Sequence, residues 1–210
     1  PGPSCNVQDT AMVLLTESKI GLGIDGVSQD NIASWLASKQ TLAPLSGEWD
    51  LQIITENNGL CELVYERQEE QSSNLFKLDV NAGKISYGSC KDRTFFDLRC
   101  VGTNMMSKPS TLVSVRCPPE MNAQLSLIYV EPNSYYLVSE VQQNTADFII
   151  GNGYFGNKET TLYAEWALSE SGSNVNSAMY LKKNQESKIL DKSLMFLSTK
   201  NQVFLNDLLR

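Results

Sequence analysis

An alternating pattern runs through the segment Gly47-Glu48-Trp49-Asp50-Leu51-Gln52-Ile53-Ile54-Thr55-Glu56. Its odd positions carry Trp49, Leu51 and Ile53, whereas its even positions are mostly charged or polar. A period of two is typical of a strand with one buried and one solvated face. A glycine directly before the strand and a large aromatic residue at its first inward position suit a β-barrel. The glycine lets the chain bend inward at one end, and the wide aromatic side chain closes that end. We therefore predict that Gly47 and Trp49 form the floor of a β-barrel.

Further alternating segments follow at spacings of about 8–12 residues, which is typical of an all-β sandwich or barrel. Turn signals separate them, and Asn57-Asn58-Gly59 and Asn81-Ala82-Gly83 each predict a hairpin. Roughly ten segments lie between residues 48 and 168, and the last of them is Thr160 to Leu168. The predicted fold is mainly β: a closed antiparallel up-and-down β-barrel of eight to ten strands.

We expect one helix before the barrel strands in the sequence and another after them. Ile32, Trp35 and Leu36 recur at i, i+3 and i+4, and Ser28 is a suitable N-cap, so the sequence predicts a short N-terminal helix. We expect this helix to cover Trp49 as a plug. An apolar stripe predicts a C-terminal helix near residues 186–197.

The predicted organisation has three parts. Residues 1–45 form an N-terminal helical and loop extension, and residues 46–170 form the barrel. Residues 171–210 supply a C-terminal helix and tail packed on the barrel, with a possible edge strand at Met179–Leu181.

Composition excludes several classes of function. The chain has 24 acidic and 17 basic residues, with a net charge of -7, which argues against a nucleic-acid partner. No run approaches the ~20 apolar residues that cross a bilayer. Histidine, the commonest general base and metal ligand, is absent from the sequence. We therefore expect no enzymatic activity, no cofactor, no metal site and no membrane span.

The cysteines allow two interpretations. There are five of them, and they show no C-x-x-C pairing that would indicate zinc or thioredoxin chemistry. Cys100 and Cys117 end like-faced segments that flank one loop, so we predict that they pair, with Cys61 and Cys90 as a second pair and Cys5 free. Two disulfide bonds would indicate a protein that is secreted or that resides in another extracytoplasmic or lumenal compartment, although this chain shows no signal peptide. The alternative is five reduced, buried thiols.

The triplet Gly47-Glu48-Trp49, preceded by residues 42–46 and followed by an apolar strand, resembles the G-x-W signature that opens the first strand of lipocalins. Residues 40 to 200 also read as strands followed by a helix, as in that family. The usual Thr-Asp-Tyr of the F–G turn is replaced by residues 140–144, and the usual arginine over the tryptophan is replaced by residues 168–170. The resemblance is therefore to an outlier lipocalin or to the wider calycin group.

This resemblance implies binding and transport of a small hydrophobic ligand in the barrel cavity: a lipid, retinoid, sterol or tetrapyrrole. The inward positions that would line the cavity are Leu51, Ile53, Leu63, Tyr65, Phe76, Leu78, Tyr87, Phe96, Leu98, Val113, Val115, Leu127, Tyr129 and Trp166. One alternative is a filled barrel that contacts a protein partner, or a second copy, through its loops, especially residues 102–110 with Met105-Met106. A calycin-type chromophore lyase or isomerase is the other alternative.

Overall fold

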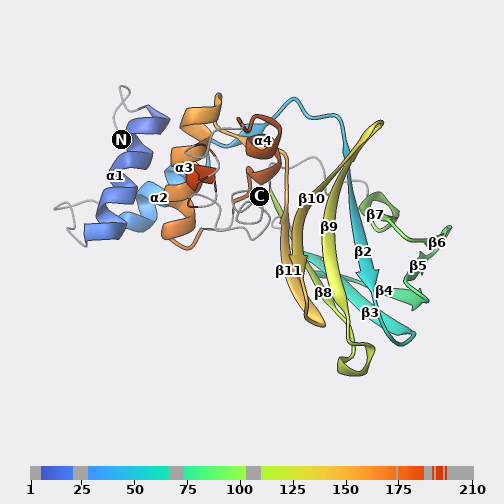
Figure 1. Ribbon diagram of the computed structural model, residues 1–210. Helices are drawn as coiled ribbons and strands as arrows, with labels where there is room; N and C mark the ends of the chain where they lie inside the picture. The colour runs from blue at the N-terminus through green and yellow to red at the C-terminus, as the bar shows by residue number, and fades with distance from the viewer. Residues whose placement is uncertain are drawn as a thin grey trace. The chain divides into compact units, whose positions relative to one another are not determined.

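The structure is a computed structural model that describes residues 6–20, 28–66, 73–102, 110–173, 175–186, 191, 193–195 and 197. It divides the chain into two compact units, which we describe separately (Figure 1). Unit 1 comprises Pro1–Pro44 and Gly151–Arg210, and unit 2 comprises Leu45–Ile150. Residues 151–170, which the sequence assigned to the barrel, thus belong to the same unit as the N-terminal segment.

Unit 1 is mainly helical. Its elements are α1 (Val7–Ile20), α2 (Gln29–Ala37), β1 (Thr41–Leu42), β12 (Gly153–Tyr154), α3 (Lys158–Glu170) and α4 (Ala178–Lys183). The short strands β1 and β12 pair antiparallel. Helix α2 confirms the predicted N-terminal helix, whereas Met179–Leu181, predicted as an edge strand, lies in α4. The helix predicted near residues 186–197 is supported in part: residues 191, 193–195 and 197 are helical, and residues 187–190, 192 and 196 lie outside the described residues.

The predicted strand at residues 160–168 is wrong, because this segment lies in helix α3. Asn157 caps the helix: its side-chain oxygen accepts a hydrogen bond from the Thr160 N–H at 2.9 Å. Ala164 and Leu168 are fully buried four residues apart, which is the spacing of one helix face. Glu165 is buried as well, although the alternating pattern assigned it to the solvent face.

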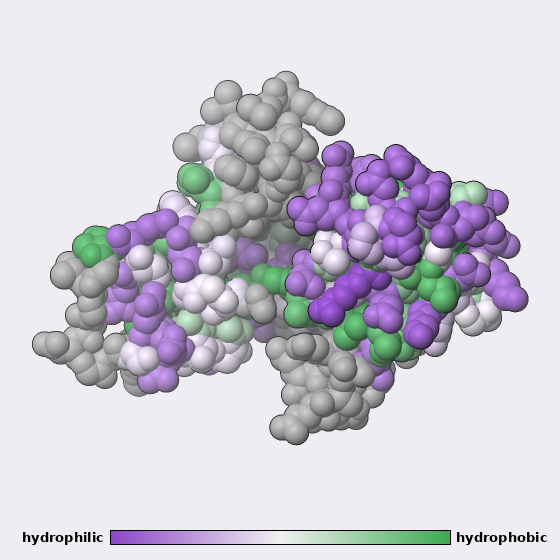
Figure 2. All heavy atoms as spheres, turned by 90° about the horizontal axis from the view of Figure 1, so that it is seen from below, coloured by the Kyte–Doolittle hydropathy of each residue, from purple (hydrophilic) through white to green (hydrophobic). Residues whose placement is uncertain are grey.

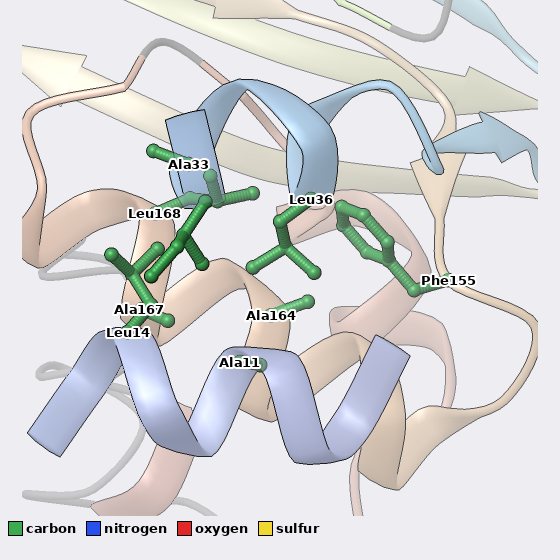
Figure 3. Packing of buried hydrophobic residues seen from close by; sticks show 9 residues of the cluster. Ala11, Leu14, Ala33, Leu36, Phe155, Ala164, Ala167 and Leu168 are labelled. Carbon is green, nitrogen blue, oxygen red and sulfur yellow. The ribbon is translucent and has the colours of Figure 1, made fainter. Parts of the chain in front are cut away.

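The core of unit 1 lies between α1, α2 and α3 (Figure 3). Leu36 of α2 lies beside Phe155 and Ala164 in this cluster, and Leu14 of α1 and Leu168 of α3 are fully buried in it. The helix that we predicted as a plug over Trp49 therefore buries its apolar face against α1 and α3.

Unit 2 consists of antiparallel β-structure. Its elements are β2 (Glu48–Ile54), β3 (Gly59–Glu66), β4 (Ser73–Asn81), β5 (Lys84–Tyr87), β6 (Cys90–Arg93), β7 (Phe96–Asp97), the 3-10 helix η1 (Leu98–Cys100), β8 (Thr111–Arg116), the 3-10 helix η3 (Pro119–Met121), β9 (Gln124–Glu131), β10 (Ser134–Val141) and β11 (Thr145–Ile150). One sheet has the order β10-β9-β2-β7, and the other has the order β11-β8-β3-β4-β5-β6 (Figure 1). Strand β2 contacts β5 and β9 contacts β11, so the two sheets share an interior.

The predicted closed up-and-down barrel is wrong, because neither sheet closes among the strands that the structure describes. Up-and-down connectivity would pair β2 with β3, but β2 pairs with β9 and β7, while β3 pairs with β4 and β8. The Asn57-Asn58-Gly59 turn therefore joins the two sheets, and the preceding Glu56 N–H donates to the Met121 carbonyl at 3.1 Å. The second predicted hairpin is confirmed between β4 and β5, with φ of 50° at Ala82 and 73° at Gly83.

Two disulfides lie in unit 2, but their pairing differs from the prediction. Cys61 is bonded to Cys117, and Cys90 is bonded to Cys100. The sheet explains the first bond: β3 and β8 are neighbours, and their register places Cys61 opposite Cys117. All four cysteines expected to pair are used, and Cys5 lies outside the described residues. Disulfides of this kind fit an oxidising, extracytoplasmic compartment.

The close approach of Tyr129 requires a glycine at position 47. The Gly47 N–H donates to the Tyr129 hydroxyl at 2.6 Å, and a Cβ atom at this position would lie 2.5 Å from the Tyr129 ring and from the Val130 carbonyl. We expect Gly47→Ala to lower the free energy of unfolding by about 2–4 kcal/mol, because the added methyl group overpacks the site and displaces Tyr129 from this hydrogen bond. Urea unfolding checks this, with Ser46→Ala at the exposed neighbour as the control. A Gly47→Ala protein as stable as that control would contradict the assigned contact.

Candidate functional site

The side chains predicted to line a cavity are mostly buried in unit 2. Leu51, Ile53, Leu63, Leu78, Phe96, Leu98, Val113, Val115, Leu127 and Tyr129 are each at most 2% exposed. Trp166 does not join them, because it lies on α3 in unit 1. Trp49 is also buried, and its ring meets that of Tyr129 edge-on at 5.1 Å. Most of the predicted lining thus packs as the core between the two sheets.

Three of the predicted residues form a continuous row of rings, which we call the aromatic strip: Tyr65 on β3, Phe76 on β4 and Tyr87 on β5. The Tyr65 and Phe76 rings stack with centroids 5.6 Å apart, and Tyr87 meets Phe76 edge-on at 5.5 Å. Phe76 pairs across the sheet with the buried Leu63, so the strip lies on the inner face. Tyr65 is buried, whereas Phe76 and Tyr87 are half-buried. The strip therefore leads from the core to the solvent.

Asn74 adds a polar group to the aromatic strip. It is the cross-strand partner of Tyr65 and precedes Phe76 by two residues, so all three share one face of the sheet. Its Nδ2 atom is buried and has no hydrogen-bond partner in the part of the chain that the structure describes. An unmade hydrogen bond at a buried donor costs about 1–3 kcal/mol. An acceptor oxygen of a bound molecule would remove this cost.

A charged cluster occupies the outer face of the four-stranded sheet. Arg99 binds Glu48 (Nη1 to Oε1, 2.5 Å) and Asp97 (Nη2 to Oδ2, 2.6 Å). Asp50 is the cross-strand partner of Asp97 and is almost buried. Burial, followed by the nearby charges of Asp97 and Glu48, raises the pKa of Asp50 to about 6, while Arg99 acts in the opposite direction.

Unit 1 holds a buried carboxyl group that the sequence pattern did not reveal. Glu165 of α3 accepts a hydrogen bond from the Ser177 N–H at 3.1 Å, and the Ser177 hydroxyl accepts one from Gln40 at 3.1 Å. Burial raises the pKa of Glu165 to about 8, although the hydrogen bonds from Ser177 act against the rise. Because Ser177 is fully buried, this network is structural.

The sequence analysis did not single out two polar residues of the candidate site, for different reasons. Asn74 occupies an inward position of β4, two residues before Phe76, so its register could have revealed it, but the prediction counted only apolar residues there. Asp50 is polar on a face taken as solvated, and its burial depends on distant chain segments. Met105-Met106, proposed as a contact loop, lies outside the described residues.

No group of three or more metal-binding side chains occurs within the described ranges. No described helix combines the length and apolar character needed to span a bilayer. Comparison of the chain with protein-family models, with curated proteins and with solved structures found no match. The resemblance to lipocalins therefore stays a prediction based on Gly47-Glu48-Trp49.

Proposed function

We propose that unit 2 binds a small, largely apolar molecule that carries an acceptor oxygen, with the aromatic strip as its binding surface. The half-buried ring of Phe76, held between Tyr65 and Tyr87, carries this proposal. Aromatic rings offer large apolar surfaces that favour flat or ring-containing ligands. The buried Nδ2 of Asn74 supplies a hydrogen-bond donor on the same face.

The binding mode differs from that of a hollow barrel. Leu63 and Leu78, the inner-face neighbours of Phe76, are fully buried in the core. A ligand would therefore lie against Phe76 and Tyr87, where the strip meets the solvent, with its oxygen directed toward Asn74. Retinoids and sterols with a hydroxyl group, and lipids with a carboxyl group, have this chemistry. The proposed role is carriage of such a molecule in an extracytoplasmic compartment, without catalysis.

Titration with all-trans-retinol, followed by its fluorescence, tests the proposal. We expect saturable binding that Phe76→Ala weakens about tenfold, which corresponds to about 1.4 kcal/mol. Leu75→Ala is the matched control, because Leu75 is the adjacent residue on the opposite face and is 53% exposed. The Leu75→Ala variant should bind retinol with a Kd within about twofold of the wild-type value, as expected for a residue outside the binding surface.

A second comparison isolates the polar contact. Asn74→Ala should weaken retinol binding several-fold, since it removes the donor, and should leave the binding of a hydrocarbon analogue without oxygen unchanged. Equal Kd values for Phe76→Ala and Leu75→Ala, or no saturable binding of retinol, cholesterol, palmitate or biliverdin, would contradict the proposal.

A further inference from the structure

A second surface lies on the outer face of the four-stranded sheet, and two exposed aromatic rings mark it. Tyr135 of β10 is 68% exposed and Phe95, just before β7, is 40% exposed. Strands β10 and β7 are the opposite edges of this sheet, yet the two ring centroids are only 5.8 Å apart. The two side chains therefore extend toward each other across the outer face.

The pairing register of the strands shows which residues lie beneath these two rings. Tyr135 is level with Val130 and Glu48, and Phe95 lies two residues before Asp97, the partner of Asp50. The rings thus meet over the row formed by Ile128 and Asp50. This position accounts for the burial of both residues on an outer face: Ile128 is 7% exposed and Asp50 is 9% exposed.

Leu137, 38% exposed, extends the apolar part of this surface, since it pairs with Ile128. Figure 2 shows unit 2 at the right from another side, where apolar residues (green) also lie among hydrophilic ones (purple). The register places Glu48, Asp50 and Asp97 on the same outer face, in the rows beneath and beside the rings. Arg99 is the only cation bonded to these carboxylates in the described part of unit 2. The surface therefore combines exposed aromatic rings with an excess of negative charge.

We propose that this surface docks a basic, apolar segment of a protein partner, in which lysine or arginine side chains alternate with apolar ones. The charges of Glu48 and Asp97 attract the cations, and the rings of Tyr135 and Phe95 contact both the apolar side chains and the cations that lie over their faces. A second copy of this chain is a poor occupant, because the same surface on both copies would oppose carboxylates to carboxylates.

Fluorescence anisotropy of two labelled synthetic peptides tests the proposal. One peptide alternates leucine with lysine, and the other alternates leucine with glutamate. We expect the lysine peptide to bind at least tenfold more tightly, with a Kd that rises with salt concentration. Tyr135→Ala should weaken its binding about tenfold, and Glu48→Gln should weaken it several-fold. Leu60→Ala is the control, because Leu60 is an equally apolar residue, 54% exposed, on the other sheet.

Three outcomes would overturn the proposal. The first is equal binding of the two peptides. The second is a Tyr135→Ala protein that binds the lysine peptide as the wild type does, or loses binding no more than Leu60→Ala does. The third is a dimer of the wild-type protein in analytical ultracentrifugation that Tyr135→Ala dissociates, because the surface would then take a second copy. Circular dichroism of each variant checks that it is folded.

Discussion

Replacing Trp49 with alanine is expected to lower the free energy of unfolding by about 3–5 kcal/mol, a large share of the ~5–15 kcal/mol that holds a domain folded. Trp49 is 1% exposed and is among the largest fully buried side chains of the protein. Its ring packs edge-on against Tyr129, whose hydroxyl holds the backbone of Gly47. Truncation would leave a cavity beside Tyr129 and loosen the start of β2.

Chemical unfolding monitored by circular dichroism measures this loss. The control is Leu75→Ala on the exposed face of β4, which should change the free energy of unfolding by less than about 0.5 kcal/mol. A Trp49→Ala protein that unfolds at the same denaturant concentration as Leu75→Ala would show that Trp49 does not organise the core of unit 2.

The second large effect concerns pH. The pKa of Glu165 is about 8 in the folded protein and 4.5 in a solvated chain, so the folded state holds this proton more tightly. The resulting contribution to stability is fully present below pH 4.5 and is lost as the pH rises through about 8. At about 1.4 kcal/mol for each pKa unit, the loss is about 4–5 kcal/mol.

Glu165→Gln removes this titration, because an amide stays neutral and still offers an oxygen to the Ser177 N–H. We expect the variant to gain stability relative to the wild type as the pH rises from 4.5 to about 8. Urea unfolding across this range measures the difference. Glu159→Gln, at an exposed position of the same helix, serves as the control and should follow the wild type. Parallel curves for Glu165→Gln and the wild type would contradict the buried, protonated state.

Alternation in the sequence was sufficient to locate most strands of unit 2. The inward positions of β2 and β9, such as Leu51 and Leu127, are buried and directly opposite each other. This success has a local cause: side chains alternate between the faces of a strand whatever its neighbours are. The prediction that an inner face would hold Tyr65, Phe76 and Tyr87 has the same origin.

Sheet order depends on contacts between distant segments, which no local pattern encodes. The Asn57-Asn58-Gly59 turn has hairpin chemistry, yet β2 pairs with β9, some seventy residues later in the chain, so the turn connects two sheets. The disulfide pairing was missed for this reason too, since it requires knowledge that β3 lies beside β8. Helix α3 was missed because its buried face includes polar residues such as Thr161 and Glu165.

The side-chain amide signal of Asn74 in a proton–nitrogen NMR spectrum tests the proposed binding most directly. We predict that titration with retinol shifts this signal downfield as the Nδ2 group gains an acceptor. In a proton–carbon spectrum the ring signals of Phe76 and Tyr87 should shift along the same binding curve. Saturable binding that moves other residues and leaves Asn74 and Phe76 unchanged would contradict the aromatic strip as the binding surface.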